Sequence, residues 1–112
     1  MLFRSPVITA PEAPAGELHP WHLYVLRLLP EAGIARDAFI ERLFAQGIGC
    51  SVHYIPLHLH PYWRDRYVLR PEMFPHSQRA YESLVSLPIY SRMDDADVQR
   101  VIAAVRALLR VA

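Results

Sequence analysis

This chain of 112 residues centres on the stretch Gly47-Ile48-Gly49-Cys50-Ser51-Val52-His53-Tyr54-Ile55-Pro56-Leu57-His58. Gly47 predicts the end of a helix, because glycine adopts the left-handed conformation without a side-chain clash. Residues 49–55 then alternate between two sets of side chains, which is typical of a strand with two different faces. Pro56 lacks an amide donor and ends the strand. The stretch therefore predicts a helix, a short strand and a loop that carries His58.

Upstream of this stretch, the sequence predicts a linker, a strand and a helix. Residues 1–18 are rich in proline and alanine, which predicts a linker or extended arm before a folded domain at residues 19–112. Residues 21–29 are almost continuously apolar, which favours a strand buried on both faces. Residues 36–46 repeat their apolar side chains at helical spacing. The side chains expected on the buried face of this helix are Ile40, Leu43 and Phe44.

Downstream of the stretch, residues 57–75 predict a loop with a short helical turn near residues 62–67. A helix is expected at residues 75–85, and a short edge strand, interrupted by a proline, at residues 86–90. A last helix follows Asp94, which we interpret as its cap rather than as half of a catalytic carboxylate pair. Its apolar stripe consists of Val98, Val101, Ile102, Val105, Leu108 and Leu109. The order of elements predicts an α+β two-layer sandwich with helices covering a three-stranded sheet.

The composition excludes several classes of protein. A net charge of +1, with twelve arginines scattered among eleven acids, disfavours nucleic-acid binding, which needs a concentrated basic patch. The single Cys50 rules out an internal disulfide and suits a reducing cytoplasm. No apolar run reaches the length of a secretory core or a membrane span. We therefore expect a cytoplasmic protein without nucleic-acid or membrane partners.

Several segments besides the central stretch carry a resemblance to a known family. They are His19-Pro20-Trp21-His22-Leu23-Tyr24-Val25, His60-Pro61-Tyr62-Trp63-Arg64, Ser86-Leu87-Pro88-Ile89-Tyr90 and Met93-Asp94-Asp95-Ala96-Asp97. In order and spacing, the chain resembles the C-terminal small domain of the DegT/DnrJ/EryC1/StrS family of sugar aminotransferases, which use pyridoxal phosphate. The resemblance covers roughly residues 17–110, which is nearly the whole chain.

The resemblance implies an activity for a longer parent protein. That enzyme would transfer an amino group, commonly from glutamate, to a keto sugar carried on a nucleoside diphosphate, for surface polysaccharides or antibiotic sugars. The implied partners are a large cofactor-binding domain of the same protein, the nucleotide-sugar substrate and a second subunit in a homodimer. The small domain would have the fold of the C-terminal domain of fold-type I aminotransferases and close one wall of the cleft.

A missing residue type limits what the chain does alone. All twelve basic residues are arginines, so the chain has no lysine. A pyridoxal phosphate aminotransferase holds its cofactor through a lysine amine, and the guanidinium of arginine stays protonated and cannot replace it. We therefore expect no cofactor binding and no catalytic residue in this chain alone, and we expect pyridoxal phosphate in the parent enzyme.

Three residues of the central stretch are candidates for substrate binding. The resemblance implies that His58 faces the cleft and contacts the sugar nucleotide. From the residues alone, Pro56 delivers His58 to an exposed loop, where an imidazole can hydrogen-bond to sugar hydroxyls; a surface histidine without a role fits the same pattern. Because consecutive strand residues point to opposite faces, we expect Tyr54 to pack in the core and His53 to face solvent or the cleft.

Two further patterns have a functional and a structural interpretation. His58 and His60, with His53 or His76, could hold a metal ion, but cysteines are missing and such pairs are common by chance, so no metal site is predicted. Aromatic and basic side chains alternate in one segment, Tyr62, Trp63, Arg64, Arg66, Tyr67 and Arg70. They suit either a nucleotide-binding surface or, as we prefer, a small core under the loop with solvated arginines.

A second class of function stays open at this point. A freestanding α+β binding or regulatory module, without catalysis, is compatible with the absence of lysine. Such a module predicts no cofactor affinity and a polar surface where a large domain would otherwise pack. It also predicts that more of residues 1–20 would pack against the domain.

Overall fold

The computed structural model describes residues 6–109. Its sheet has three antiparallel strands in the order β1 (Ile8–Thr9), β2 (Tyr24–Leu28) and β3 (Leu84–Leu87). The α-helices are α1 (Arg36–Phe44), α2 (Pro61–Tyr67), α3 (Pro75–Ser83) and α4 (Asp95–Leu109). Short 3-10 turns lie at η1 (Pro30–Ala32), η2 (Leu57–Leu59) and η3 (Pro71–Met73). The α+β class and the three-stranded sheet are confirmed.

The predicted strand at residues 49–55 is wrong. Only Ser51 pairs with the sheet, through reciprocal backbone bonds to Ser86 of 3.1 and 2.8 Å. The third strand is instead β1, from the segment expected to be a linker or extended arm, and its Ile8 is buried opposite Leu28. Ile8 enters the core from this position, whereas the side chains that follow Ser51 find no apolar layer to cover them.

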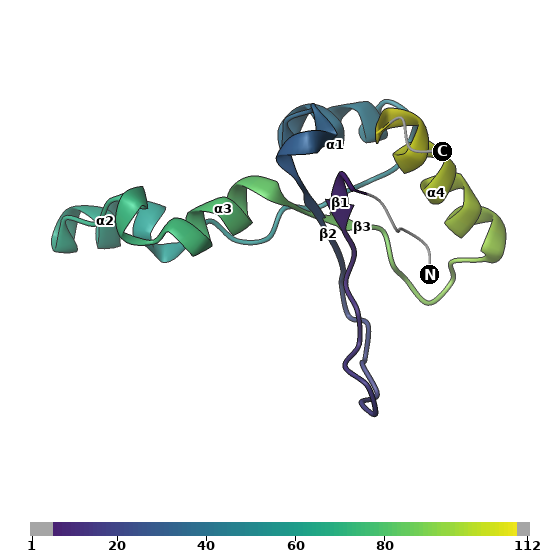
Figure 1. Ribbon diagram of the computed structural model, residues 1–112, viewed down its shortest axis with the longest axis horizontal. Helices are drawn as coiled ribbons and strands as arrows, with labels where there is room; N and C mark the ends of the chain where they lie inside the picture. Colours follow the sequence, from purple (N-terminus) through teal and green to yellow (C-terminus); the bar gives the residue numbers. More distant parts are fainter. Residues whose placement is uncertain (1–5, 110–112) are drawn as a thin grey trace.

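The core lies where α1 and α4 meet each other and the sheet (Figure 1). Its fully buried side chains are Leu26, Phe39, Leu43, Val85 and Val105. Most of the stripe predicted for the last helix is buried, which confirms that prediction. On α1, however, Phe39 and Leu43 form the buried pair one turn apart, while Phe44 is exposed, so its predicted burial is wrong. Phe44 is the last residue of α1.

The turn after α1 and the start of α4 both have the structure that their residues predict. Gly47 has a φ of 72°, as expected after a helix, and Arg100 Nη2 donates to the carbonyl of Gln46 at 2.6 Å. At the start of α4, the amide of Asp97 donates to Asp94 Oδ1 at 2.9 Å and the amide of Asp94 donates to Asp97 Oδ2 at 3.4 Å. The predicted cap at Asp94 is therefore confirmed as a reciprocal capping arrangement.

The sheet, α1 and α4 together form the body of the molecule. Two projections leave this body (Figure 1). The first is the hairpin of residues 10–23 between β1 and β2, which turns at Gly16, whose φ is 83°. The second is the helical arm, which we define as residues 52–83 and which contains η2, α2, η3 and α3. The predicted helical turn near residues 62–67 is confirmed by α2, while β3 begins two residues earlier than the predicted strand and ends before Pro88.

Candidate functional site

A cavity of about 370 Å³ lies where the helical arm leaves the sheet. Its lining residues are Val52, His53, Tyr54, Ile55, His60 and Tyr81. The extended segment before η2 supplies the first four, His60 directly follows η2, and Tyr81 lies on α3. The cavity therefore combines imidazole rings and phenol hydroxyls, which both donate and accept hydrogen bonds.

His53 is fixed against the sheet. Its Nε2 hydrogen-bonds to the hydroxyl of Ser86, which is buried in β3. The imidazole is half-buried and lines the cavity. His53 therefore faces the cavity while its ring is held against the sheet, and its contact with substrate stays a prediction.

Tyr54 is 93% exposed, so its predicted place in the core is wrong. The prediction assumed a two-faced strand, and the chain has already left the sheet when it reaches this residue. The Tyr54 and His53 rings lie 6.5 Å apart at 56° and both line the cavity. The phenol of Tyr54 is therefore presented to solvent at the cavity rim.

Two cavity residues were not recognised as binding candidates from the sequence. His60 was considered only as a metal ligand, yet its Nε2 lies 3.0 Å from the carbonyl oxygen of Ile55 and donates to it. Tyr81 stands on α3, and the guanidinium of Arg36 lies 5.3 Å above its ring while donating to its carbonyl at 3.1 Å. The position of His60 directly after a predicted turn was the one sequence feature that could have indicated a binding role. Tyr81 has no such feature, because only tertiary packing brings it to the cavity.

His58 lies outside the cavity lining and is only 4% exposed. Its Nε2 lies 2.9 Å from Gln78 Oε1, and its ring stacks on Phe74 at 5.0 Å. Gln78 in turn donates to Glu82 Oε1 at 2.7 Å. The expectation of an exposed His58 is therefore wrong, because α3 returns over the turn and covers the imidazole. A direct contact of His58 with substrate stays a prediction.

The aromatic segment of α2 does not form a small core. Tyr62 and Trp63 meet edge to face at 5.0 Å, and Trp63 and Tyr67 stack at 5.9 Å, but all of these rings are exposed. The preferred structural interpretation is therefore wrong in its burial, because nothing in the arm covers the rings. Arg64 pairs with its neighbour Asp65 at 2.7 Å.

Other chemistry is limited in the part of the chain that the structure describes. Residues 6–109 contain no group of three or more His, Cys, Asp or Glu side chains that could hold a metal ion. Burial raises the pKa of the Cys50 thiol, which disfavours the thiolate that a nucleophile requires. Among the described residues, no helix combines the length and the apolar content that a membrane span requires.

Comparison with known proteins assigns the chain to a family. Residues 3–106 match the model of the DegT/DnrJ/EryC1/StrS aminotransferase family. The spore coat polysaccharide biosynthesis protein SpsC of Bacillus subtilis is 42% identical over 94 residues, which are 82% of this chain and 24% of SpsC.

Solved structures agree with this assignment. The aminotransferase TlmJ of Streptoalloteichus hindustanus superimposes with a TM-score of 0.77 and 31% identity over 94% of this chain and 27% of TlmJ. The sugar aminotransferase Spr1654 of Streptococcus pneumoniae, solved in its PMP-form, gives a TM-score of 0.69 and 25% identity over 80% of this chain and 22% of its own. The chain thus spans about a quarter of the length of these relatives. It belongs to the DegT/DnrJ/EryC1/StrS aminotransferase family.

Proposed function

We propose that this chain acts as the C-terminal small domain of a pyridoxal-phosphate-dependent nucleotide-sugar aminotransferase. The observation that carries the proposal is a family match over nearly the whole chain that spans only a quarter of each relative. The parent enzyme would transfer an amino group from glutamate to a keto sugar on a nucleoside diphosphate. The role of SpsC in a polysaccharide pathway supports a product of the same kind.

The cofactor belongs to the rest of that enzyme. Pyridoxal phosphate supplies the electron sink for amine transfer when bound. This chain by itself does not fit the cofactor, because it has no lysine to hold it. Arg36, whose side chain is only 10% exposed, is not available for a cofactor either, because it pairs with Asp37 and donates to the Tyr81 carbonyl. We therefore propose that the large domain holds the cofactor, that the enzyme is a cytoplasmic homodimer, and that this chain alone is not catalytic.

The cavity of the arm supports a role in substrate binding. His53 is held in place by Ser86, and His60 by the Ile55 carbonyl, so both rings have fixed orientations. Tyr54 adds an exposed hydroxyl at the rim. Sugar hydroxyls are donors and acceptors at once, and imidazole and phenol groups match both roles at neutral pH. We propose that His53 and Tyr54 contact the sugar nucleotide.

His58 takes a different part in this proposal. Its buried imidazole joins the turn at η2 to Gln78 and Phe74 on the other side of the arm. In this position it orients the segment that carries His53 and Tyr54. A direct contact with substrate, as the family resemblance implies, requires that Gln78 or Phe74 move aside when substrate binds.

The test is a chimera in which this chain replaces the matching segment of SpsC. With cofactor bound, the chimera is expected to convert glutamate to 2-oxoglutarate when supplied with a panel of nucleoside diphosphate keto sugars. His53→Ala and Tyr54→Phe are expected to raise KM for the sugar nucleotide more than they lower kcat. Glu12→Gln, in the hairpin, is the matched control. A folded, cofactor-bound chimera that never transfers the amine would favour a freestanding, non-catalytic module.

A further inference from the structure

The chain exposes more surface than a compact domain of its size. Its accessible surface is 8158 Å² and its radius of gyration is 15.8 Å, with extents of 48 × 34 × 26 Å. A compact monomer of this mass would expose about 6,300 Å² and have a radius of gyration near 13 Å. The excess is roughly 1,800 Å², which is as much as one partner contributes to a large permanent interface.

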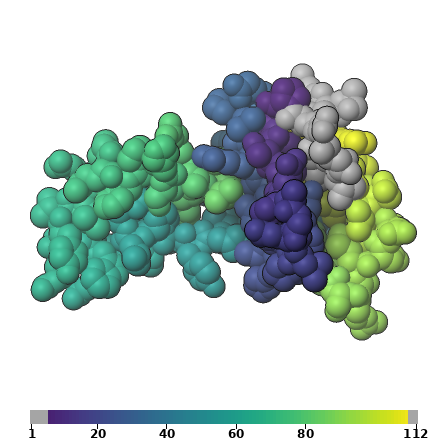
Figure 2. Space-filling model, turned by 60° about the horizontal axis from the view of Figure 1, so that its bottom comes forward, coloured from purple at the N-terminus to yellow at the C-terminus, as the bar shows by residue number. Residues whose placement is uncertain are grey.

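The helical arm stands apart from the body (Figure 1). Figure 2 shows the arm, in teal and green, extending to one side of the body. No residue of the arm belongs to the hydrophobic core. Its exposed large apolar side chains are Val52, Tyr54, Ile55, Leu57, Tyr62, Trp63, Tyr67, Val68, Met73 and Phe74. Exposed apolar side chains gathered in such number on one projection favour a surface for a partner.

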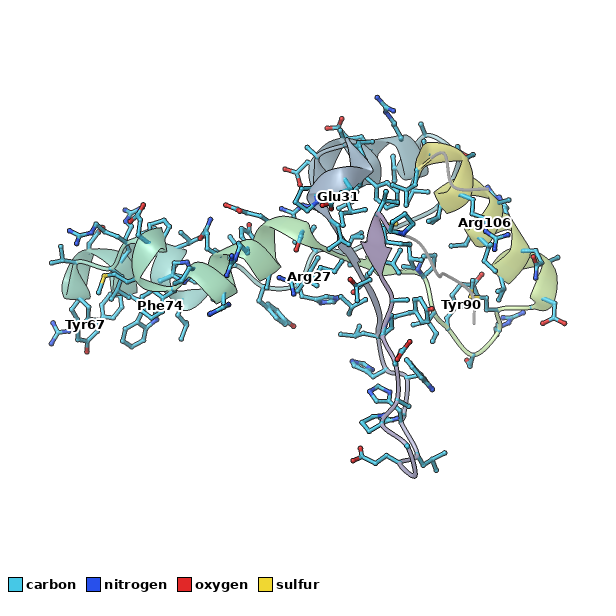
Figure 3. The ribbon with its side chains drawn as sticks, viewed as in Figure 1. Arg27, Glu31, Tyr67, Phe74, Tyr90 and Arg106 are labelled. Carbon is cyan, nitrogen blue, oxygen red and sulfur yellow. The ribbon has the colours of Figure 1, made fainter. Side chains whose placement is uncertain are left out.

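The aromatic rings of the arm are already arranged as an interface. Trp63 stacks on Tyr67 one helical turn away, and Tyr62 meets Trp63 edge to face. Figure 3 places Tyr67 and Phe74 on the side of the arm toward which the hairpin also projects. Tyrosine, tryptophan, phenylalanine and methionine are the residues enriched at interface centres. The rings therefore need little ordering when a partner covers them.

The family membership identifies the occupant. About three quarters of each relative lies outside the segment that this chain matches. A domain joined covalently to this chain has a far higher effective concentration near the arm than a second copy of the chain.

We propose that the aromatic side of the helical arm, which we define by Tyr62, Trp63, Tyr67 and Phe74, is the surface on which the large domain of the same polypeptide packs. This proposal rests on the proposed function and adds the surface by which the two domains meet. It assigns Trp63 and Tyr67 to the centre of the contact, because their stacked rings form its largest flat element.

The experiment compares the same substitutions in two proteins, the isolated chain and its chimera with SpsC. Tyr62→Ser, Trp63→Ser and Tyr67→Ser are combined in one variant. The melting temperature of the isolated chain is expected to change by less than about 2 °C, because the rings are exposed there. That of the chimera is expected to fall by about 5 °C or more, because interface rings are lost. Phe44→Ser, equally exposed but on α1, is the matched control and is expected to change neither protein.

Hydrogen exchange of the unsubstituted proteins gives an independent measurement. Peptides covering residues 61–70 are expected to exchange at least about tenfold more slowly in the chimera than in the isolated chain. Equal exchange, or equal melting shifts of the triple variant in both proteins, would overturn the proposal. A stable dimer of the isolated chain that the triple variant dissociates would also overturn it and assign the surface to a second copy.

These outcomes separate the two proposals. An active chimera in which the triple variant has no selective effect retains the aminotransferase function and removes the docking surface. A chimera protected in residues 61–70 but unable to transfer the amine retains the surface and removes the function.

Discussion

The body and the helical arm use apolar side chains in opposite ways. In the body, the sheet, α1 and α4 enclose Leu26, Phe39 and Val105 completely. In the arm, comparable or larger rings lie on the outside, and the one fully covered polar ring is His58. The body is therefore stabilised by its own core, while the arm is held together by a small polar and aromatic cluster.

This contrast explains why a composition with 53% hydrophobic residues does not indicate which of these residues form the core. Apolar content counts side chains that a domain buries in itself together with those it reserves for a neighbour. The two kinds differ only in whether another element of the same chain covers them. The first prediction tests the core of the body, and the later ones test positions with progressively less burial.

Phe39→Ala should have the largest effect. The ring is fully buried between α1 and the sheet, so its removal leaves a cavity and should cost about 3–5 kcal/mol of unfolding free energy. Urea denaturation followed by circular dichroism measures this loss. Phe44→Ala on the same helix is the control and should stay within about 0.5 kcal/mol. Similar losses for both variants would contradict the division between core and surface.

His58→Ala should have an intermediate and local effect. Gln78 loses its partner and Phe74 its stacked ring, at a cost of about 1–3 kcal/mol. Because the arm does not share the core, hydrogen exchange should accelerate within residues 57–78 while α4 stays protected. His76→Ala, on the exposed side of α3, should leave the exchange unchanged. Uniform acceleration of the whole chain would show that arm and body unfold together.

Asp94→Ala should have a smaller effect, confined to the body. The carboxylate accepts from the amide of Asp97 at the start of α4, and losing such a cap costs about 1 kcal/mol. Thermal unfolding of the variant measures the loss. Asp95→Ala lies one residue further on, keeps the cap, and should cost no more than a few tenths of a kcal/mol. A larger loss from Asp95→Ala would place the helix start elsewhere.

The smallest expected effect is a change in the titration of Tyr90. Its hydroxyl donates to Asp97 Oδ2 at 3.1 Å, and this bond raises the pKa of Tyr90 above its usual value. The raised folded-state pKa favours the protonated phenol, so its contribution to stability is complete below the unfolded pKa and fades as the pH rises through the folded one. In Asp97→Asn, ultraviolet absorbance should show one tyrosine ionising at lower pH. An unchanged titration would exclude the bond in solution.

Elements with local signals were predictable from the sequence. The capped start of α4 and the turn at Gly47 after α1 depend on residues within one turn of each other. Strand pairing was not predictable, because the alternation at residues 49–55 is compatible with a strand but does not indicate which other strand would pair with it. The prolines around β1 concealed the strand that actually pairs.

The candidate site shows the same division. The sequence placed His53 and Tyr54 next to each other and His58 after a turn. It did not show that α3 would cover His58 with Phe74 and Gln78, or bring Tyr81 to the cavity. Those contacts join residues that are far apart in the chain, so no local pattern records them.

The reciprocal bonds between Ser51 and Ser86 have an evolutionary consequence. They bring the two ends of the arm together at the sheet, so the arm is a closed insertion in an otherwise continuous body. Since lengthening a closed loop costs little free energy, relatives can lengthen, shorten or resurface the arm without rebuilding the sheet. A short turn that joins residue 51 directly to residue 84 should leave a minimal body that still folds. In that sense the sheet and its two helices form a unit whose folding does not depend on the length of the arm.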